Sequence, residues 1–88
     1  MSVDVLTLRV SVPEVWDLVT LEAAPDWTVE RLKSEALAAA LGGSPDAARY
    51  ETKFRGGLVL DERATLASLD VRSGASLIVL PARRRPVR

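Results

Sequence analysis

The sequence contains no cysteine and no histidine. Without cysteine it can form no disulfide, and nothing in its composition points to an oxidising compartment, so we expect a cytoplasmic location. The absence of both residues removes the main ligands of zinc and transition-metal sites and the groups used in Ser-His and Cys-His nucleophilic catalysis. The carboxylates are scattered, and the adjacent pair Asp61-Glu62 fits a solvated turn better than an acid/base pair. We therefore expect no catalytic residue, no metal site and no cofactor, and hence no enzyme.

Long apolar runs are also missing, since no run approaches the roughly 18 residues of a membrane span, and no basic start followed by an apolar stretch indicates a signal peptide. The 88 residues, 48% of them hydrophobic, suit one small globular domain. Net charge is zero but uneven: twelve acids and eight bases before Pro81 give −4, and four arginines after it give +4. We expect a domain over residues 1–81 and a basic, flexible tail over residues 82–88.

Apolar and polar residues alternate in two N-terminal segments, which predicts two strands. Residues 3–12 form the first, Pro13-Glu14 mark a turn, and residues 15–23 form the second. Asp17 fits the apolar face of the second strand poorly, which indicates a bulge or loop there. A short turn between two strands predicts an antiparallel hairpin.

Residues 28–41 read as a helix with clear start and stop signals. Thr28 is a good N-cap, and Trp27 before it can pack onto Leu32 as a hydrophobic staple. Gly42-Gly43 supply the C-terminal stop. The predicted apolar stripe consists of Val29, Leu32, Ala36, Ala40 and Leu41. After the stop, Ser44 and Pro45 predict the cap and first residue of a short helical turn.

The remaining segments predict short strands. Residues 50–54 and 58–60 flank a turn at Gly56-Gly57, residues 61–70 form a turn and a helical turn, and residues 76–80 form the last strand. Leu66, Leu69 and Val71 are expected to point inward, as are Leu77 and Val79, whereas Ile78 and Leu80 face the other way. The order β-β-α-β-β-β, with one main helix packed across a mixed sheet, predicts an α+β roll.

Two ungapped stretches, VTLEAAPDWTVERLK (residues 19–33) and LDERATLASLDVRSGASLIVL (residues 60–80), resemble ubiquitin. The resemblance implies a ubiquitin-like β-grasp roll in which the first and last strands pair in parallel at the centre of the sheet. It also places Lys33 at a mostly buried helix position. This fold hosts modifiers, sulfur carriers, adaptors and enzyme subunits, so the resemblance alone implies no one function.

The chain departs from conjugated members and sulfur carriers of this family, which end in a flexible Gly-Gly. It ends in Pro-Val-Arg, and its glycine pairs, Gly42-Gly43 and Gly56-Gly57, are internal. We therefore expect a non-conjugated member, and the excess of arginine over lysine together with frequent alanine hints at a GC-rich genome and a bacterial type. A processed terminus would reopen the modifier and sulfur-carrier alternatives.

The binding face of ubiquitin is altered in this sequence. Its central aliphatic position corresponds to Lys53, the aliphatic position of the last strand is kept as Leu80, and a neighbouring histidine becomes Ile78. Desolvating Lys53 would oppose the binding of partners that read ubiquitin's patch. Trp16 and Leu18 either join Ile78 and Leu80 in an exposed apolar strip, or Trp16 folds over the end of the hairpin.

The arginine tail allows three interpretations: a solubilising end, a docking arm for an acidic protein surface, or nucleic-acid binding. We do not expect nucleic acid, because the body is acidic and the basic arm has no aromatic residue. Pro81 has no N–H and is expected to end the pairing of the last strand.

Together these features predict a non-catalytic ubiquitin-like protein–protein interaction module, an adaptor or accessory subunit similar in size and layout to the small ubiquitin-like protein of type VII secretion systems. An accessory subunit of a multicomponent oxygenase is the alternative from another class. The partner is expected to be a protein, with no membrane span. The predicted protein-binding residues are Trp16, Leu18, Lys53, Ile78, Leu80, Arg83, Arg84 and Arg85.

Overall fold

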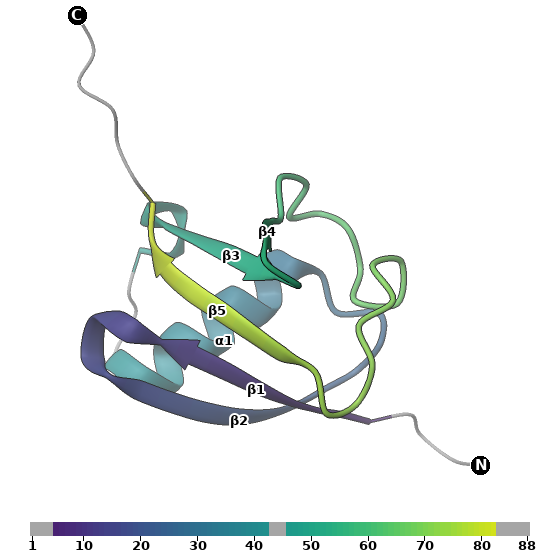
Figure 1. The fold of residues 1–88 in the computed structure, drawn as a ribbon, viewed down its shortest axis with the longest axis horizontal. Helices are drawn as coiled ribbons and strands as arrows, with labels where there is room; N and C mark the ends of the chain where they lie inside the picture. The colour runs from purple at the N-terminus through teal and green to yellow at the C-terminus, as the bar shows by residue number, and fades with distance from the viewer. Residues whose placement is uncertain (1–4, 43–45, 83–88) are drawn as a thin grey trace, which may run out of the picture.

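The structure, a computed structural model, describes residues 5–42 and 46–82 of the chain. A single main helix lies across one face of a five-stranded mixed sheet (Figure 1). The strands are β1 (Leu6–Val12), β2 (Asp17–Ala23), β3 (Tyr50–Phe54), β4 (Gly57–Leu58) and β5 (Ser76–Pro81), the helix is α1 (Val29–Leu41), and the 3-10 turns are η1 (Pro13–Val15) and η2 (Ala47–Arg49). The α+β class and the element order predicted from the sequence are confirmed.

The strand order in the sheet is β2-β1-β5-β3-β4. β1 and β5 pair in parallel at the centre, with Val10 opposite Leu77, while the other three pairs are antiparallel. The expected parallel pairing of the first and last strands is therefore confirmed. It brings together the two strands that lie farthest apart in the sequence.

The hairpin differs from the predicted one at its turn. β1 begins at Leu6, and residues 3 and 4 of the predicted strand lie outside the described residues. β2 begins at Asp17 and not at residue 15, because Pro13–Val15 form η1. Proline fixes φ near the helical value and needs no N–H partner at the start of such a turn, which explains why a 3-10 turn begins here.

The hydrophobic core lies between α1 and the sheet. Thr28 caps the helix by accepting a hydrogen bond from the N–H of Arg31 at 3.2 Å, as predicted. Leu37 belongs to the buried face of α1, whereas Ala40 and Leu41 of the predicted stripe are only half-buried. Fully or nearly fully buried apolar residues are Leu8, Val10, Val12, Ala23, Val29, Leu32, Ala36, Leu37, Leu66, Val71, Leu77 and Val79.

Trp27 is half-buried and packs against this core, which contains Leu32, the residue onto which it was predicted to staple. The guanidinium carbon of Arg31 lies 4.4 Å from the centroid of its ring. This tryptophan therefore contributes to the fold, as its predicted role as a staple requires.

Lys33 is the one buried charged residue of the described part of the chain, with 3% of its surface exposed. Its ammonium donates to the backbone oxygen of Tyr50 at 2.9 Å and to the carboxylate of Glu62 at 2.6 Å. These bonds join α1 to β3 and to the β4–β5 connection, and they agree with the buried helix lysine that the resemblance implied.

The β4–β5 connection contains little helix. Its backbone is tied to the entry of α1, since Leu66 N–H donates to Trp27 C=O and Val29 N–H donates to Ala64 C=O. The predicted helical turn reduces to two backbone bonds, from Leu69 N–H to Thr65 C=O and from Asp70 N–H to Ala67 C=O. The inward positions of Leu66 and Val71 are confirmed, and Leu69 is half-buried.

The predicted strand over residues 58–60 needs correction. β4 spans two residues and ends at Leu58, so the predicted return strand over 58–60 is mostly absent. The turn η2 is capped by Asp46, whose side chain accepts from Ala48 N–H at 3.2 Å. The predicted cap Ser44, Pro45 and the second helix-stop glycine at position 43 lie outside the described residues.

Pro81 does not end the pairing of β5. It lies opposite Tyr50 in the ladder, and the next residue, Ala82, donates its N–H to Arg49 C=O at 2.8 Å. Successive N–H groups of a strand point to opposite edges, so the N–H that Pro81 lacks would face the β1 side. Pairing of β5 with β1 has already ended at Ile78, and proline is tolerated at such a position.

Candidate protein-binding face

The face of the sheet opposite α1 carries a straight row of side chains across all five strands. Ladder pairing places Leu18 opposite Ser11, Ser11 opposite Ile78, Ile78 opposite Lys53, and Lys53 opposite Leu58. Residues paired directly across strands project on the same side of a sheet. Figure 1 shows α1 behind the sheet, so this row lies on the face that no described element covers.

The apolar members of the row are exposed. The exposed fractions are 59% for Leu18, 45% for Leu58 and 40% for Ile78. Leu80 projects on the same face, two residues after Ile78, and is half-buried beside Glu51, its partner in the ladder. The structure thus brings together four of the predicted residues (Leu18, Lys53, Ile78 and Leu80), but Ser11 separates Leu18 from Ile78.

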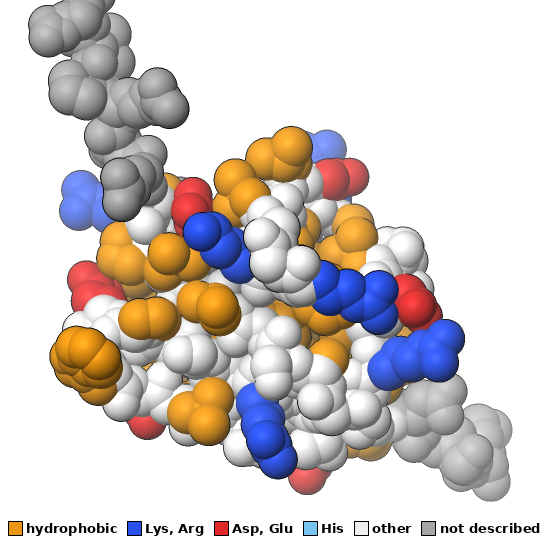
Figure 2. Space-filling view, in the orientation of Figure 1, with side chains coloured by type: hydrophobic (Ala, Val, Ile, Leu, Met, Phe, Trp, Pro, Cys, Tyr) orange, Lys and Arg blue, Asp and Glu red, His pale blue; other side chains and the backbone are white. Residues whose placement is uncertain are grey.

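Basic side chains occupy another part of the same face. Arg9 lies opposite Ser76 in the ladder, and Arg55 and Arg72 flank the carboxylate of Asp70 at 3.7 Å and 3.1 Å. These ion pairs are exposed and add little stability. In Figure 2, which looks onto this face, orange hydrophobic side chains lie mainly toward the left and top, and blue basic side chains lie mainly across the middle and right, with others at the upper left and top right.

The binding residues predicted from the sequence do not include Leu58, Arg9, Arg55 or Arg72. The alternation of the first strand already placed Arg9 on the outer face, so Arg9 could have been found. The positions of Arg55 and Arg72 depend on a turn and a loop, for which alternation gives no signal.

Strand alternation predicted that Trp16 lies on this face as part of the second strand, but Trp16 is not part of a strand. It follows η1, before β2 begins, and adopts the left-handed backbone conformation with φ 56° and ψ 37°. Its side chain is 95% exposed, so it does not fold over the end of the hairpin. The exposure of Trp16 therefore comes from the turn itself.

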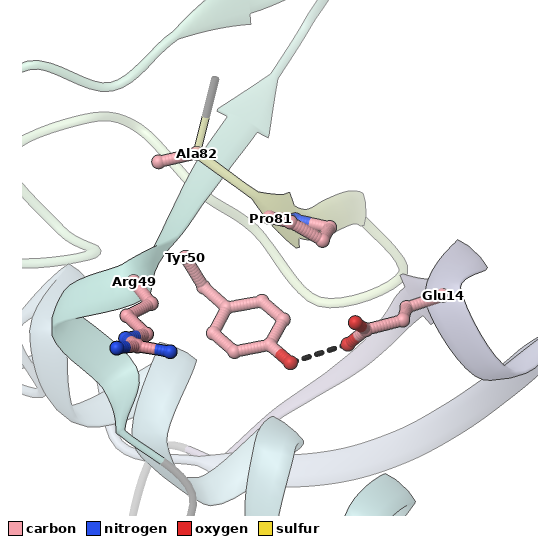
Figure 3. A pocket seen from close by; sticks show the side chains of 5 residues that line it. All are labelled: Glu14, Arg49, Tyr50, Pro81 and Ala82. Carbon is pink, nitrogen blue, oxygen red and sulfur yellow. Dashed lines mark hydrogen bonds between the residues drawn. The ribbon is translucent and has the colours of Figure 1, made fainter. Parts of the chain in front are cut away.

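A pocket of about 390 Å³ opens where the β1–β2 turn, the start of β3 and the end of β5 meet. Figure 3 shows Glu14, Arg49, Tyr50, Pro81 and Ala82 around it, with the Tyr50 hydroxyl donating to the Glu14 carboxylate. This hydrogen bond, with smaller effects of burial and of the Glu14 charge, raises the pKa of Tyr50, and the Arg49 charge opposes the rise. Thirty-six residues separate the two partners, so no local pattern could have revealed them.

No protein-family model matches the sequence, and no curated protein sequence matches it. Solved structures do match. A ubiquitin of Caldiarchaeum subterraneum superimposes with a TM-score of 0.77 at 17% identity, covering 92% of this chain and 98% of that one. The ubiquitin-like domain of an Arabidopsis thaliana protein gives 0.77 at 16% identity, with 99% and 87% covered. A protein designed on the basis of ubiquitin gives 0.73 at 20% identity, with 96% of each chain covered.

The chain has the ubiquitin-like β-grasp fold. At these identities the likeness concerns the fold and does not extend to the binding residues. Within the described residues of this ubiquitin-like domain, no helix is long and apolar enough to cross a membrane, and no three His, Cys, Asp or Glu side chains gather as metal ligands. The predicted residues Arg83, Arg84 and Arg85 lie outside the described part of the chain.

Proposed function

We propose that this ubiquitin-like domain is a non-catalytic protein–protein interaction module that docks a partner protein on its open sheet face. The observation that carries the proposal is the row in which Leu18, Ile78 and Leu58 are exposed on one face, with Leu80 beside them. Removing apolar surface from water stabilises a complex by about 25 cal/mol per Å² before the opposing terms of association. A grouped set of exposed aliphatic side chains is typical of an interaction site.

Lys53 shapes which partners fit. It sits between Ile78 and Leu58 in the row, so a flat apolar surface pressed onto the sheet would desolvate its ammonium. A lysine stem can lie along apolar surface while the charged end stays hydrated or meets an acid. The partner therefore needs a carboxylate, or access for water, at this point.

The finer assignment is an adaptor or accessory subunit of bacterial type, acting in the cytoplasm without being conjugated to other proteins. It is supported by the resemblance in size and layout to the small ubiquitin-like protein of type VII secretion systems. It is also supported by the place of Gly56-Gly57 inside the fold, at the β3–β4 turn.

The test is affinity purification from the source cells with the intact protein and variants as bait, quantified by mass spectrometry. We expect proteins held by the wild type to be lost with Ile78→Asp and with Leu80→Asp. Ser34→Asp, at an exposed position of α1, is the matched control and should retain them. Melting curves verify that each variant is folded, and Ile78, being more exposed than Leu80, is the safer site.

Retention of the same proteins by both sheet-face variants would contradict the proposed interface. The identity of a specifically retained protein separates the functional classes. A secretion ATPase supports the adaptor assignment, a diiron oxygenase component supports the oxygenase subunit, and an activating enzyme supports a modifier or sulfur carrier.

A further inference from the structure

The turn between β1 and β2 projects a tryptophan that the fold does not use. Trp16 is 95% exposed, and among the hydrogen bonds of the described residues none involves its indole N–H. Trp27 offers the comparison within the same chain, because it is half-buried and packs against the core. Burial in the domain therefore accounts for Trp27 and leaves Trp16 without a structural role.

The backbone of Trp16 is also unfavourable. With φ 56° and ψ 37° it occupies the left-handed region, which disfavours residues with a Cβ atom and which glycine adopts freely. A glycine would close the same turn with less strain. Arg55 and Asp70 are also left-handed, with φ 56° and 61°, but their side chains form an ion pair with each other, whereas that of Trp16 contacts nothing that explains its conformation. Strained positions of this kind cluster at functional sites.

The turn holds the tryptophan in a defined place. Trp16 N–H donates to Pro13 C=O at 3.1 Å, which closes η1, and proline limits the freedom of the first residue. Glu14 is bonded to Tyr50 of β3, as Figure 3 shows. A turn whose backbone is already ordered loses little conformational entropy when the side chain it presents is bound.

The charged residues of the β1–β2 turn itself are both acidic. Glu14 and Asp17, the two charged residues of the turn, flank Trp16 and are both exposed. Arg49 lies across the pocket that Glu14 lines, beside Tyr50 (Figure 3). The tip of the turn therefore presents an exposed tryptophan between two carboxylates, whereas the charged groups near the centre of the sheet face are mainly arginines.

We propose that Trp16 is an anchor that inserts into an apolar pocket of a protein partner, and that the rim of this pocket carries lysine or arginine side chains facing Glu14 and Asp17. The inference rests on the proposed function, a protein-binding module, and adds a second contact point with its own chemistry. Tryptophan is among the residues that contribute most when buried at the centre of an interface. Opposite charges around the pocket would set the orientation and raise the association rate.

The probe is a displayed library of designed ankyrin-repeat proteins, whose randomised surface is concave and can form a pocket. Binders are selected on the intact protein and then measured against variants. For most binders we expect Trp16→Gly to weaken affinity about 30-fold or more, the size of a hot-spot loss. Trp16→Phe should retain part of the affinity, and Leu60→Ser, which changes another strongly exposed apolar residue, should retain all of it.

Two further readouts separate insertion from misfolding. The melting midpoint of Trp16→Gly should equal or exceed that of the wild type, because glycine relieves the left-handed strain and little buried surface is lost. In a Trp27→Phe background, Trp16 is the only tryptophan, and its fluorescence emission should shift to shorter wavelength when a binder is added. The selected binders should be enriched in lysine and arginine relative to the unselected library.

Binders that bind Trp16→Gly as tightly as the wild type, or that show no enrichment in basic residues, would overturn the anchor. If such binders are lost with Ile78→Asp, the proposed function stands and only the anchor fails. Binders insensitive to both changes, or a selection that yields none, count against both. Concentration-dependent dimerisation that Trp16→Gly abolishes would replace the proposed partner by a second copy of the chain.

Discussion

The buried lysine of α1 allows a quantitative test of how the fold is held together. Glu62→Ala leaves the Lys33 ammonium, 3% exposed, with the Tyr50 carbonyl as its remaining partner. Removing one member of a buried ion pair costs about 3–5 kcal/mol. Because the side chain of Glu62 is itself 27% exposed, water weakens the attraction that is lost, and we expect the lower end, about 3 kcal/mol.

The complementary variant should be less harmful. Lys33→Met removes the charge and keeps a long apolar stem, and the carboxylate of Glu62 can turn to water. What remains is the loss of a donor to the Tyr50 carbonyl, for which we expect about 1 kcal/mol. The predicted order, in which losing the acid destabilises more than losing the base, follows from the burial of the ammonium.

Urea unfolding followed by circular dichroism measures the free energies of unfolding. In thermal melting, the midpoint of Glu62→Ala should be lower than that of the wild type by roughly 12–24 °C. Glu35→Ala, at an exposed site of α1, is the control and should change stability by less than about 0.5 kcal/mol. Equal destabilisation by Lys33→Met and Glu62→Ala would refute a dominant cost of the unpaired ammonium. A Glu62→Ala variant as stable as Glu35→Ala would refute any contribution of the ion pair.

Three other outcomes are expected. Leu32→Ala, at a fully buried position of α1, should cost about 2–5 kcal/mol in urea unfolding, and an unchanged midpoint would mean that the helix face is misassigned. Tyr50 is the only tyrosine, so phenolate absorbance should titrate above pH 10.0, and Glu14→Ala should lower that midpoint. Stability from the Glu14 bond is present below pH 10.0 and is lost as pH rises through the folded pKa. Deleting residues 83–88 should slow association with a retained partner mainly at low ionic strength, and an equal effect at high salt would exclude steering by charge.

Local patterns predicted the elements well where one residue decides the structure. Thr28 fixed the helix start, and the alternation in residues 76–80 separated the inner Leu77 and Val79 from the outer Ile78. The turn was predicted less well, because Pro13 starts a 3-10 turn that moves Trp16 out of the strand. Strand alternation correctly predicted that Trp16 is exposed, but its exposure comes from the turn and not from a place in the strand.

The long-range parts of the site could not follow from local sequence. The row from Leu18 to Leu58 requires the register of four strand pairs, and short turns set only two of them, β1–β2 and β3–β4. The two pairs that β5 forms, with β1 and with β3, join segments that are distant in the sequence. Lys33 bonds to Glu62, which is 29 residues away in the sequence, and Tyr50 bonds to Glu14, which is 36 residues away. The resemblance to ubiquitin supplied the order of the strands and the burial of Lys33, which residue patterns alone left open.

The parallel pair at the centre of the sheet also governs how the domain can be synthesised. Val10 meets Leu77, so the sheet cannot close until residues near the end of the chain are available. Contacts between such distant positions slow folding, because the loop between them must be closed first. During translation β1 and β2 can form only a hairpin, which is marginal by itself. The domain should therefore fold as a unit only after β5 has left the ribosome, and a nascent chain stalled before Ser76 should remain sensitive to protease.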